Sequence, residues 1–166
     1  MCFSLFSVEI KVITKNYNLI GAVYTNHQAS RLNQFFFKAR LSKNGFVGLT
    51  SEKFATFRNK RLYEIVIGPK AVARFIGLNA TGDLTKNTSA PFTLAGGNKA
   101  FYNPDSTVSY WLSWTGAKID FGFGDVVGQQ MILSANISHV GYDIRHIGFA
   151  TSQGATDSFW YFNDGK

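Results

Sequence analysis

The chain has 166 residues, of which 45% are hydrophobic, 16% aromatic and 16% charged. A chain of this length and apolar content builds one domain with a real core, which excludes two full domains and an intrinsically disordered protein. No segment approaches the run of about 18 to 20 apolar residues that spans a bilayer, so no membrane span is expected.

The net charge of +7 is concentrated in the first half of the chain. Residues 1–83 hold twelve Lys and Arg against four Asp and Glu, whereas residues 84–166 hold five against six. Such an asymmetry is typical of a solvated basic face and, alternatively, of a protein with an anionic partner. The only tight cluster of bases is Arg58, Lys60 and Arg61.

The hydrophobic pattern has a period of two residues along most of the chain, which predicts strands with one buried face. In chain order, strands are expected at 8–12, 35–41, 45–49, 62–67, 71–76, 92–94, 106–114, 118–123, 130–134, 139–142, 144–151 and 158–162. No long segment carries the apolar stripe of an amphipathic helix. For 51–59 two predictions stay open, a short helix or a strand followed by a loop. Short, evenly spaced strands indicate a β-sandwich or closed barrel, and we expect an all-β, antiparallel β-sandwich of the jelly-roll, lectin-like type in a single domain, 5–164.

A single cysteine, Cys2, excludes an intrachain disulfide and a Cys-rich metal site. The first residues lack a basic leader, so we expect a cytoplasmic protein as the sequence is written and a secreted one if a leader was removed. Three triplets, at 79–81, 87–89 and 136–138, fit the N-glycan acceptor pattern.

Candidate catalytic and metal-binding residues are few. His139 and His146 are seven residues apart, with no further ligand at a spacing that completes a metal site. Asp120 and Asp125 could form a carboxylate pair, although Asp is also common in loops. The glycine-rich segment 122–128 is followed by a predicted strand rather than a helix, which favours a bulge or hairpin over a nucleotide loop. We therefore predict no catalytic set and no metal site.

The aromatic segment 110–114 is more informative. Tyr110, Leu112 and Trp114 share one face of a strand, and Trp111 lies on the other face between Ser109 and Ser113. An aromatic ring among small polar side chains is how a sugar or a flat apolar ligand is often bound. The alternative is that Trp111 packs beneath a loop or a second sheet.

Several sequence motifs together resemble the domain known as farnesoic acid O-methyltransferase in arthropods and other invertebrates. They are Tyr-Glu-Ile-Val-Ile-Gly at 63–68, Tyr-Trp-Leu-Ser-Trp at 110–114 followed by Gly116 and 118–122, and the closing segments 139–141, 147–151, Gly154 and 160–162. The resemblance covers about residues 35–163. It departs from the family pattern at Pro69, where a second glycine often stands, and in the long loop 83–105.

The family name implies methyl transfer from S-adenosylmethionine to the carboxylate of a sesquiterpenoid acid, giving a juvenile-hormone-type ester. The usual methyltransferase of that cofactor has an α/β sheet with a Gly-rich turn into a helix, and this sequence predicts neither. The resemblance therefore implies a fold more strongly than a reaction.

Three functions stay open at this point. The first is a non-catalytic recognition module without a cofactor that binds a carbohydrate, lipid or protein. The second is the S-adenosylmethionine-dependent enzyme, and the third is a structural or adhesive protein that forms homo-oligomers through strand edges. For the first, the candidate ligand contacts are Trp111, Tyr110, His146, Arg145, Arg58, Lys60 and Arg61.

Overall fold

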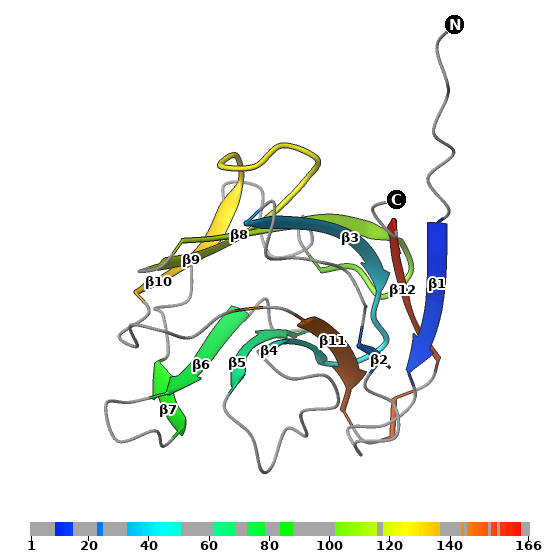
Figure 1. Cartoon of the computed structure of the whole chain (residues 1–166). Helices are drawn as coiled ribbons and strands as arrows, with labels where there is room; N and C mark the ends of the chain where they lie inside the picture. Colours follow the sequence, from blue (N-terminus) through cyan, green and yellow to red (C-terminus); the bar gives the residue numbers. More distant parts are fainter. Residues whose placement is uncertain are drawn as a thin grey trace, which may run out of the picture.

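Two antiparallel sheets packed face to face form the protein in the computed structural model shown in Figure 1. The structure describes residues 9–14, 23–24, 33–50, 62–68, 73–78, 84–87, 102–115, 118–136, 144, 146–152, 154–155 and 157–163. All elements in these ranges are strands, and the ranges contain no helix long and apolar enough to cross a membrane.

Each sheet has six strands. Sheet A has the order β1-β12-β3-β8-β9-β10, and sheet B has the order β2-β11-β4-β5-β6-β7. The strands are β1 (Glu9–Thr14), β2 (Val23–Tyr24), β3 (Gln34–Arg40), β4 (Gly45–Thr50), β5 (Leu62–Ile67), β6 (Ala73–Leu78), β7 (Leu84–Asn87), β8 (Val108–Trp114), β9 (Lys118–Phe123), β10 (Met131–Asn136), β11 (His146–Thr151) and β12 (Ser158–Asn163).

This architecture confirms the predicted all-β antiparallel sandwich of the jelly-roll type. Two strands, β2 and β7, were not predicted, and several others are shifted at one or both ends by up to two residues; β6, β8 and β11, for example, each begin two residues after the predicted starts at 71, 106 and 144. Both missed strands are short, with two and four residues, so neither shows enough alternation to be recognised. The predicted strands 92–94 and 139–142, and the segment 51–59, lie outside the described residues.

The last two strands lock the beginning of the chain into the sandwich. β12 inserts between β1 and β3 in sheet A, while β11 inserts between β2 and β4 in sheet B. Consecutive strands near the C-terminus therefore pair in different sheets with strands from the first third of the chain (Figure 1). Because these pairings are distant in sequence, their formation carries a loop-closure cost, and slow folding is expected.

Aromatic rings join the two sheets. Phe149 of sheet B lies 4.7 Å from Trp160 and 5.5 Å from Phe37, both of sheet A, measured between ring centroids. Tyr110 stacks on Phe37 at 5.1 Å. The polar end of Trp160 is satisfied inside the core, where its indole N–H donates a hydrogen bond of 2.8 Å to Oγ1 of Thr14.

Two tyrosines bring hydroxyl groups to this core. The hydroxyl of Tyr102 donates to the backbone carbonyl of Leu41 at 2.9 Å. Burial raises the pKa of Tyr110 far above its ordinary value, and the neighbouring Tyr102 raises it further. Burial also raises the pKa of Tyr102. Both hydroxyls therefore stay protonated in the folded protein at neutral pH.

Because the pKa of Tyr110 is raised on folding, the free energy of unfolding is expected to depend on pH in the alkaline range. Below the unfolded-state value of about 10, both states keep the proton, so the contribution of this tyrosine is fully present. As the pH rises above about 10, the unfolded chain releases the proton while the folded chain retains it, and the free energy of unfolding falls. We expect urea denaturation to show a steeper fall above pH 10 for the wild type than for Tyr110→Phe. Equal slopes for the two proteins would contradict this account.

Candidate functional site

The outer face of sheet A carries a short series of aromatic and charged side chains. On β3, alternate residues point into the core or outward, so Phe35 and Phe37 are 3% and 2% exposed whereas Phe36 between them is 45% exposed. Lys38 and Arg40 share the outward face with Phe36 and are exposed. A large aromatic side chain is thus presented to solvent beside two cations.

Trp111 lies directly across from Phe36 on β8, yet it is fully buried. Its ring covers Gly122 of β9, where an added Cβ would lie only 2.3 Å from Cζ2 of the indole. Phe36, Trp111 and Gly122 are successive partners in the register and form one row across the outer face. This row ends at Met131 of β10, which is 40% exposed. Glycine therefore makes a shallow space on the sheet, and Trp111 lies flat in it.

The loop 124–130 folds back over Trp111 and removes it from solvent. The indole N–H of Trp111 donates to the carbonyl of Gln129 at 2.8 Å, and the N–H of Gly124 donates to the carbonyl of Ser109 at 2.8 Å. Gly124 and Gly128 have positive φ values of 92° and 85°, a conformation that other residues rarely adopt. This confirms the hairpin interpretation of the glycine-rich segment, with a bulge between Met131 and Leu133 at the start of β10.

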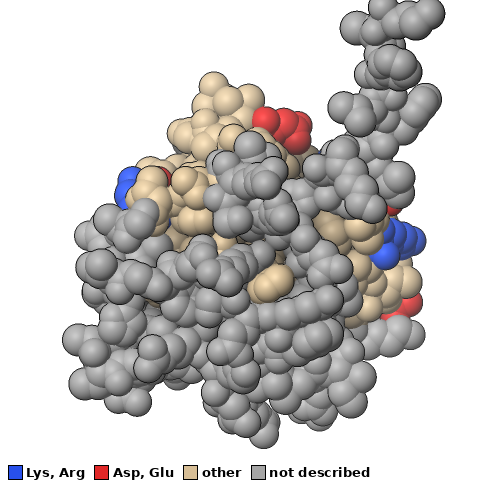
Figure 2. All heavy atoms as spheres, in the orientation of Figure 1, with Lys and Arg blue, Asp and Glu red and all other residues tan. Residues whose placement is uncertain are grey.

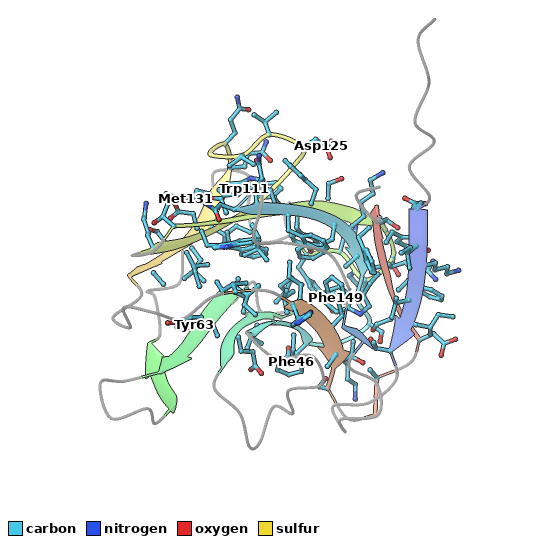
Figure 3. All side chains as sticks on the ribbon, in the orientation of Figure 1. Phe46, Tyr63, Trp111, Asp125, Met131 and Phe149 are labelled. Carbon is cyan, nitrogen blue, oxygen red and sulfur yellow. The ribbon has the colours of Figure 1, made fainter. Side chains whose placement is uncertain are left out.

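A depression of about 80 Å³ lies on this outer face. Its outward-facing side chains come from four places: β1, β3, β12 and the loop 124–130, where Figure 3 shows Asp125 above sheet A. They are Glu9, Phe36, Lys38, Asp125 and Tyr161, and the core residues Phe37, Tyr110 and Phe162 complete the lining. The depression therefore combines aromatic surface with two carboxylates and one ammonium group.

Cations and aromatic rings continue from one side of the depression across β12. Lys11 of β1 and Lys38 of β3 flank Tyr161 in the strand register, and Arg40 stands opposite Phe159. The ammonium group of Lys11 and the guanidinium group of Arg40 each lie 4.5 Å from the centroid of the Phe159 ring. We call Lys11, Lys38 and Arg40 the basic strip. Basic atoms are visible at the side of the molecule where β1 and β12 lie (Figure 2).

Of the residues predicted as ligand contacts, the structure describes Trp111, Tyr110 and His146, and it does not bring these three together at the surface. Trp111 and Tyr110 are 0% and 1% exposed, so neither ring offers a face to solvent, and Trp111 instead packs beneath a loop, which was the alternative interpretation. His146 is half-buried at the start of β11 in sheet B, paired with Thr50, whereas Trp111 belongs to sheet A. Arg145, Arg58, Lys60 and Arg61 lie outside the described residues.

Sequence reasoning missed Phe36, although a signal was present. In the run Phe35-Phe36-Phe37 the middle residue stands at an outward position of a strand whose neighbours point inward, so a solvent-facing aromatic could have been inferred. Glu9, Asp125 and Tyr161 had no comparable signal. They come together only because β12 pairs with both β1 and β3 and because the loop 124–130 folds back.

The chemistry available in the depression is that of binding. Carboxylates accept hydrogen bonds from hydroxyl groups, an ammonium group donates them, and an exposed ring stacks against an apolar face. Within the described ranges, no three or more His, Cys, Asp and Glu side chains are grouped so that they could hold a metal ion. The Tyr110 side chain is buried in the core and burial raises its pKa, so its hydroxyl is unsuited to act as a base near neutral pH.

Replacement of Gly122 tests whether Trp111 is a structural anchor. A methyl group at this position would overlap the indole, so we expect Gly122→Ala to lower the free energy of unfolding by about 1–3 kcal/mol in urea denaturation. Relief of the overlap should make Gly122→Ala less costly in a Trp111→Leu background. The same cost in both backgrounds would show that the contact with Trp111 is not the cause.

Solved structures of low sequence identity have a similar arrangement of strands. Part of stonustoxin aligns with 86% of this chain at a TM-score of 0.50 and 11% identity, covering 22% of that larger protein. Chicken galectin 2 aligns with 76% of this chain and 88% of its own length at a TM-score of 0.49 and 12% identity. A carbohydrate-binding module from Bacillus subtilis aligns with 79% of this chain and 73% of its own at 0.48 and 11% identity.

Comparison with curated proteins finds no matching sequence. A family profile, in contrast, matches residues 17–166, which is most of the chain and includes β2 to β12 and thus nearly all of both sheets. Of the residues quoted for the resemblance, 63–67 lie in β5, 110–114 in β8 and 118–122 in β9. The chain therefore belongs to the family described as farnesoic acid O-methyl transferase.

Proposed function

We propose that this protein is a non-catalytic recognition module that binds a saccharide on the outer face of sheet A, without a cofactor. The observation that supports the proposal is the depression in which exposed Phe36 stands beside Glu9, Asp125 and Lys38. A sugar ring has an apolar face of C–H groups and an edge of hydroxyl groups. The first matches an aromatic ring, and the second matches carboxylates and an ammonium group.

The size of the depression favours surface recognition over enclosure. Pockets that bury a drug-sized ligand usually have volumes of about 300–1,000 Å³, whereas this depression has about 80 Å³. One sugar residue, or the end of a chain, fits such a space while the rest of the ligand lies across the sheet. Affinity for a single sugar is then expected to be modest, since most of the ligand stays solvated.

The rigidity of the site also supports binding. Phe36 and Lys38 stand on β3, a central strand of sheet A, and Tyr161 stands on the neighbouring β12. The hydrogen bond between Trp111 and Gln129 holds the loop that carries Asp125. Little side-chain and loop entropy is therefore lost when a ligand is bound.

The alternative function is the enzyme named by the family description, and the depression is poorly suited to bind its cofactor. S-adenosylmethionine is a drug-sized cofactor, so the volume of about 80 Å³ is several times too small to bury it. Methyl transfer to a carboxylate also requires the sulfonium to be held in line with the acid.

Removal of the exposed ring is the direct test of saccharide binding. After a glycan array identifies a ligand, we expect Phe36→Ala to weaken its binding about tenfold in titration calorimetry, because stacking on an aromatic ring contributes about 1–2 kcal/mol. Met131→Ala is the matched control, since Met131 is 40% exposed at the far end of the same row and does not line the depression. Equal loss in both variants, or no ligand on the array at high micromolar protein, would contradict the proposal.

A cofactor titration tests the alternative. We expect no heat of binding when S-adenosylmethionine is titrated to millimolar concentration, and no labelled methyl group on farnesoic acid after incubation with the protein. Saturable binding together with methylated product would replace the proposed function by the enzymatic one.

A further inference from the structure

The basic strip lies next to the depression but is not explained by the binding of a neutral sugar. Lys38 belongs to both, since it lines the depression and also stands across from Tyr161, whose other neighbour in the register is Lys11. Adjacent strands are about 4.8 Å apart, which places the backbones of Lys11 and Lys38 about 10 Å from each other on the same face. Arg40 follows Lys38 by two residues and therefore points to the same side.

Aromatic contacts hold two of these cations against the sheet. Lys11 lies 4.5 Å from the centroid of Phe159 and 5.8 Å from that of Tyr161, and Arg40 lies 4.5 Å from that of Phe159. Such contacts restrict the long side chains while leaving their hydrogen-bond donors accessible. The strip is therefore partly ordered before any ligand arrives, which lowers the entropic cost of binding an anion.

None of the three cations is held in an ion pair by the described residues, although Glu9 and Asp125 line the depression together with Lys38. Within the part of the chain that the structure describes, no carboxylate forms an ion pair with Lys11, Lys38 or Arg40, whereas Lys118 on the same sheet is 3.0 Å from Asp120. Like charges gathered on one exposed face repel one another, and an anionic ligand removes that repulsion. Arginine and lysine donors are well suited to sulfate and carboxylate oxygens.

We infer that the ligand is an anionic saccharide, sulfated or carboxylated, whose sugar ring occupies the depression and whose acidic group lies on the basic strip. The inference rests on the proposed function and adds the ligand class. The carboxylates of Glu9 and Asp125 argue against a nucleic acid, because they would face a continuous polyphosphate backbone. The two carboxylates suit a sugar, because its hydroxyl groups can donate hydrogen bonds to them. The acidic substituent of the same sugar can then contact the basic strip beside the depression.

The experiment compares a chondroitin sulfate hexasaccharide with its desulfated and carboxyl-reduced form, which carries no charge, by titration calorimetry. The sulfated form should bind more tightly, and Lys11→Gln and Arg40→Gln should each weaken its binding about fivefold, the range of a partly solvated charge-assisted hydrogen bond. Neither substitution should change the binding of the neutral form. At an ionic strength of about 1 M, where the screening length is about 3 Å, the preference for sulfate should be lost.

The matched control is Lys118→Gln, which removes one positive charge from the same sheet at a residue 44% exposed and already paired with Asp120. If Lys118→Gln weakens binding as much as Arg40→Gln, only net charge matters and the assigned strip is wrong. If both hexasaccharides bind equally and Phe36→Ala weakens both, the proposed function stands and the anionic ligand class is wrong. If neither binds, the proposed function itself fails for this ligand family.

Two further binding measurements distinguish the anionic saccharide from other anionic partners. Vesicles of phosphatidylserine and phosphatidylcholine present a charged membrane surface, and a single-stranded oligonucleotide presents a polyphosphate. Tighter binding to either than to the sulfated hexasaccharide, with the same sensitivity to Arg40→Gln, would assign the strip to that partner and overturn the inference. Thermal unfolding of each variant, expected at the wild-type temperature, verifies that the substitutions leave the fold intact.

Discussion

The hydrogen bond from the Trp111 indole to the carbonyl of Gln129 is the interaction on which the candidate site depends. It fixes the loop 124–130 over sheet A, and that loop carries Asp125 to the edge of the depression. Two glycines with positive φ allow the loop to turn back, and Gly122 leaves room for the indole beneath it. A large aromatic residue on an outer face thus serves to position the loop that carries Asp125.

The face-to-face packing of the sheets provides the support beneath that site. Phe37 and Tyr110 stack on each other in the core and also form part of the floor of the depression. Phe149 links this group to sheet B. Because the floor is made of core residues, the shape of the outer face is coupled to the integrity of the aromatic core, and a substitution in the core is expected to alter both stability and binding.

The family description and the geometry emphasise different properties of the molecule. The match to the family described as farnesoic acid O-methyl transferase covers residues of both sheets, including β5, in which 63–67 are buried, and the paired strands β8 and β9. Such residues specify a sandwich. The outward residues Phe36, Lys38 and Tyr161, in contrast, form the surface of the depression, and a fold can carry many different functions on such positions.

The amino-acid sequence by itself determined the fold class and the position of most strands, because alternation of apolar and polar residues is a local property that a two-layer sandwich requires. It also placed Phe36 on an outward position between two inward phenylalanines. Only the tertiary structure decided which aromatic ring is accessible: Trp111 and Phe36 are neighbours on the same face, but the loop 124–130 covers the first and leaves the second open. The meeting of Glu9, Lys38, Asp125 and Tyr161 was likewise decided by long-range strand pairing and by the folding back of one loop, and no pattern within a single segment carries that information.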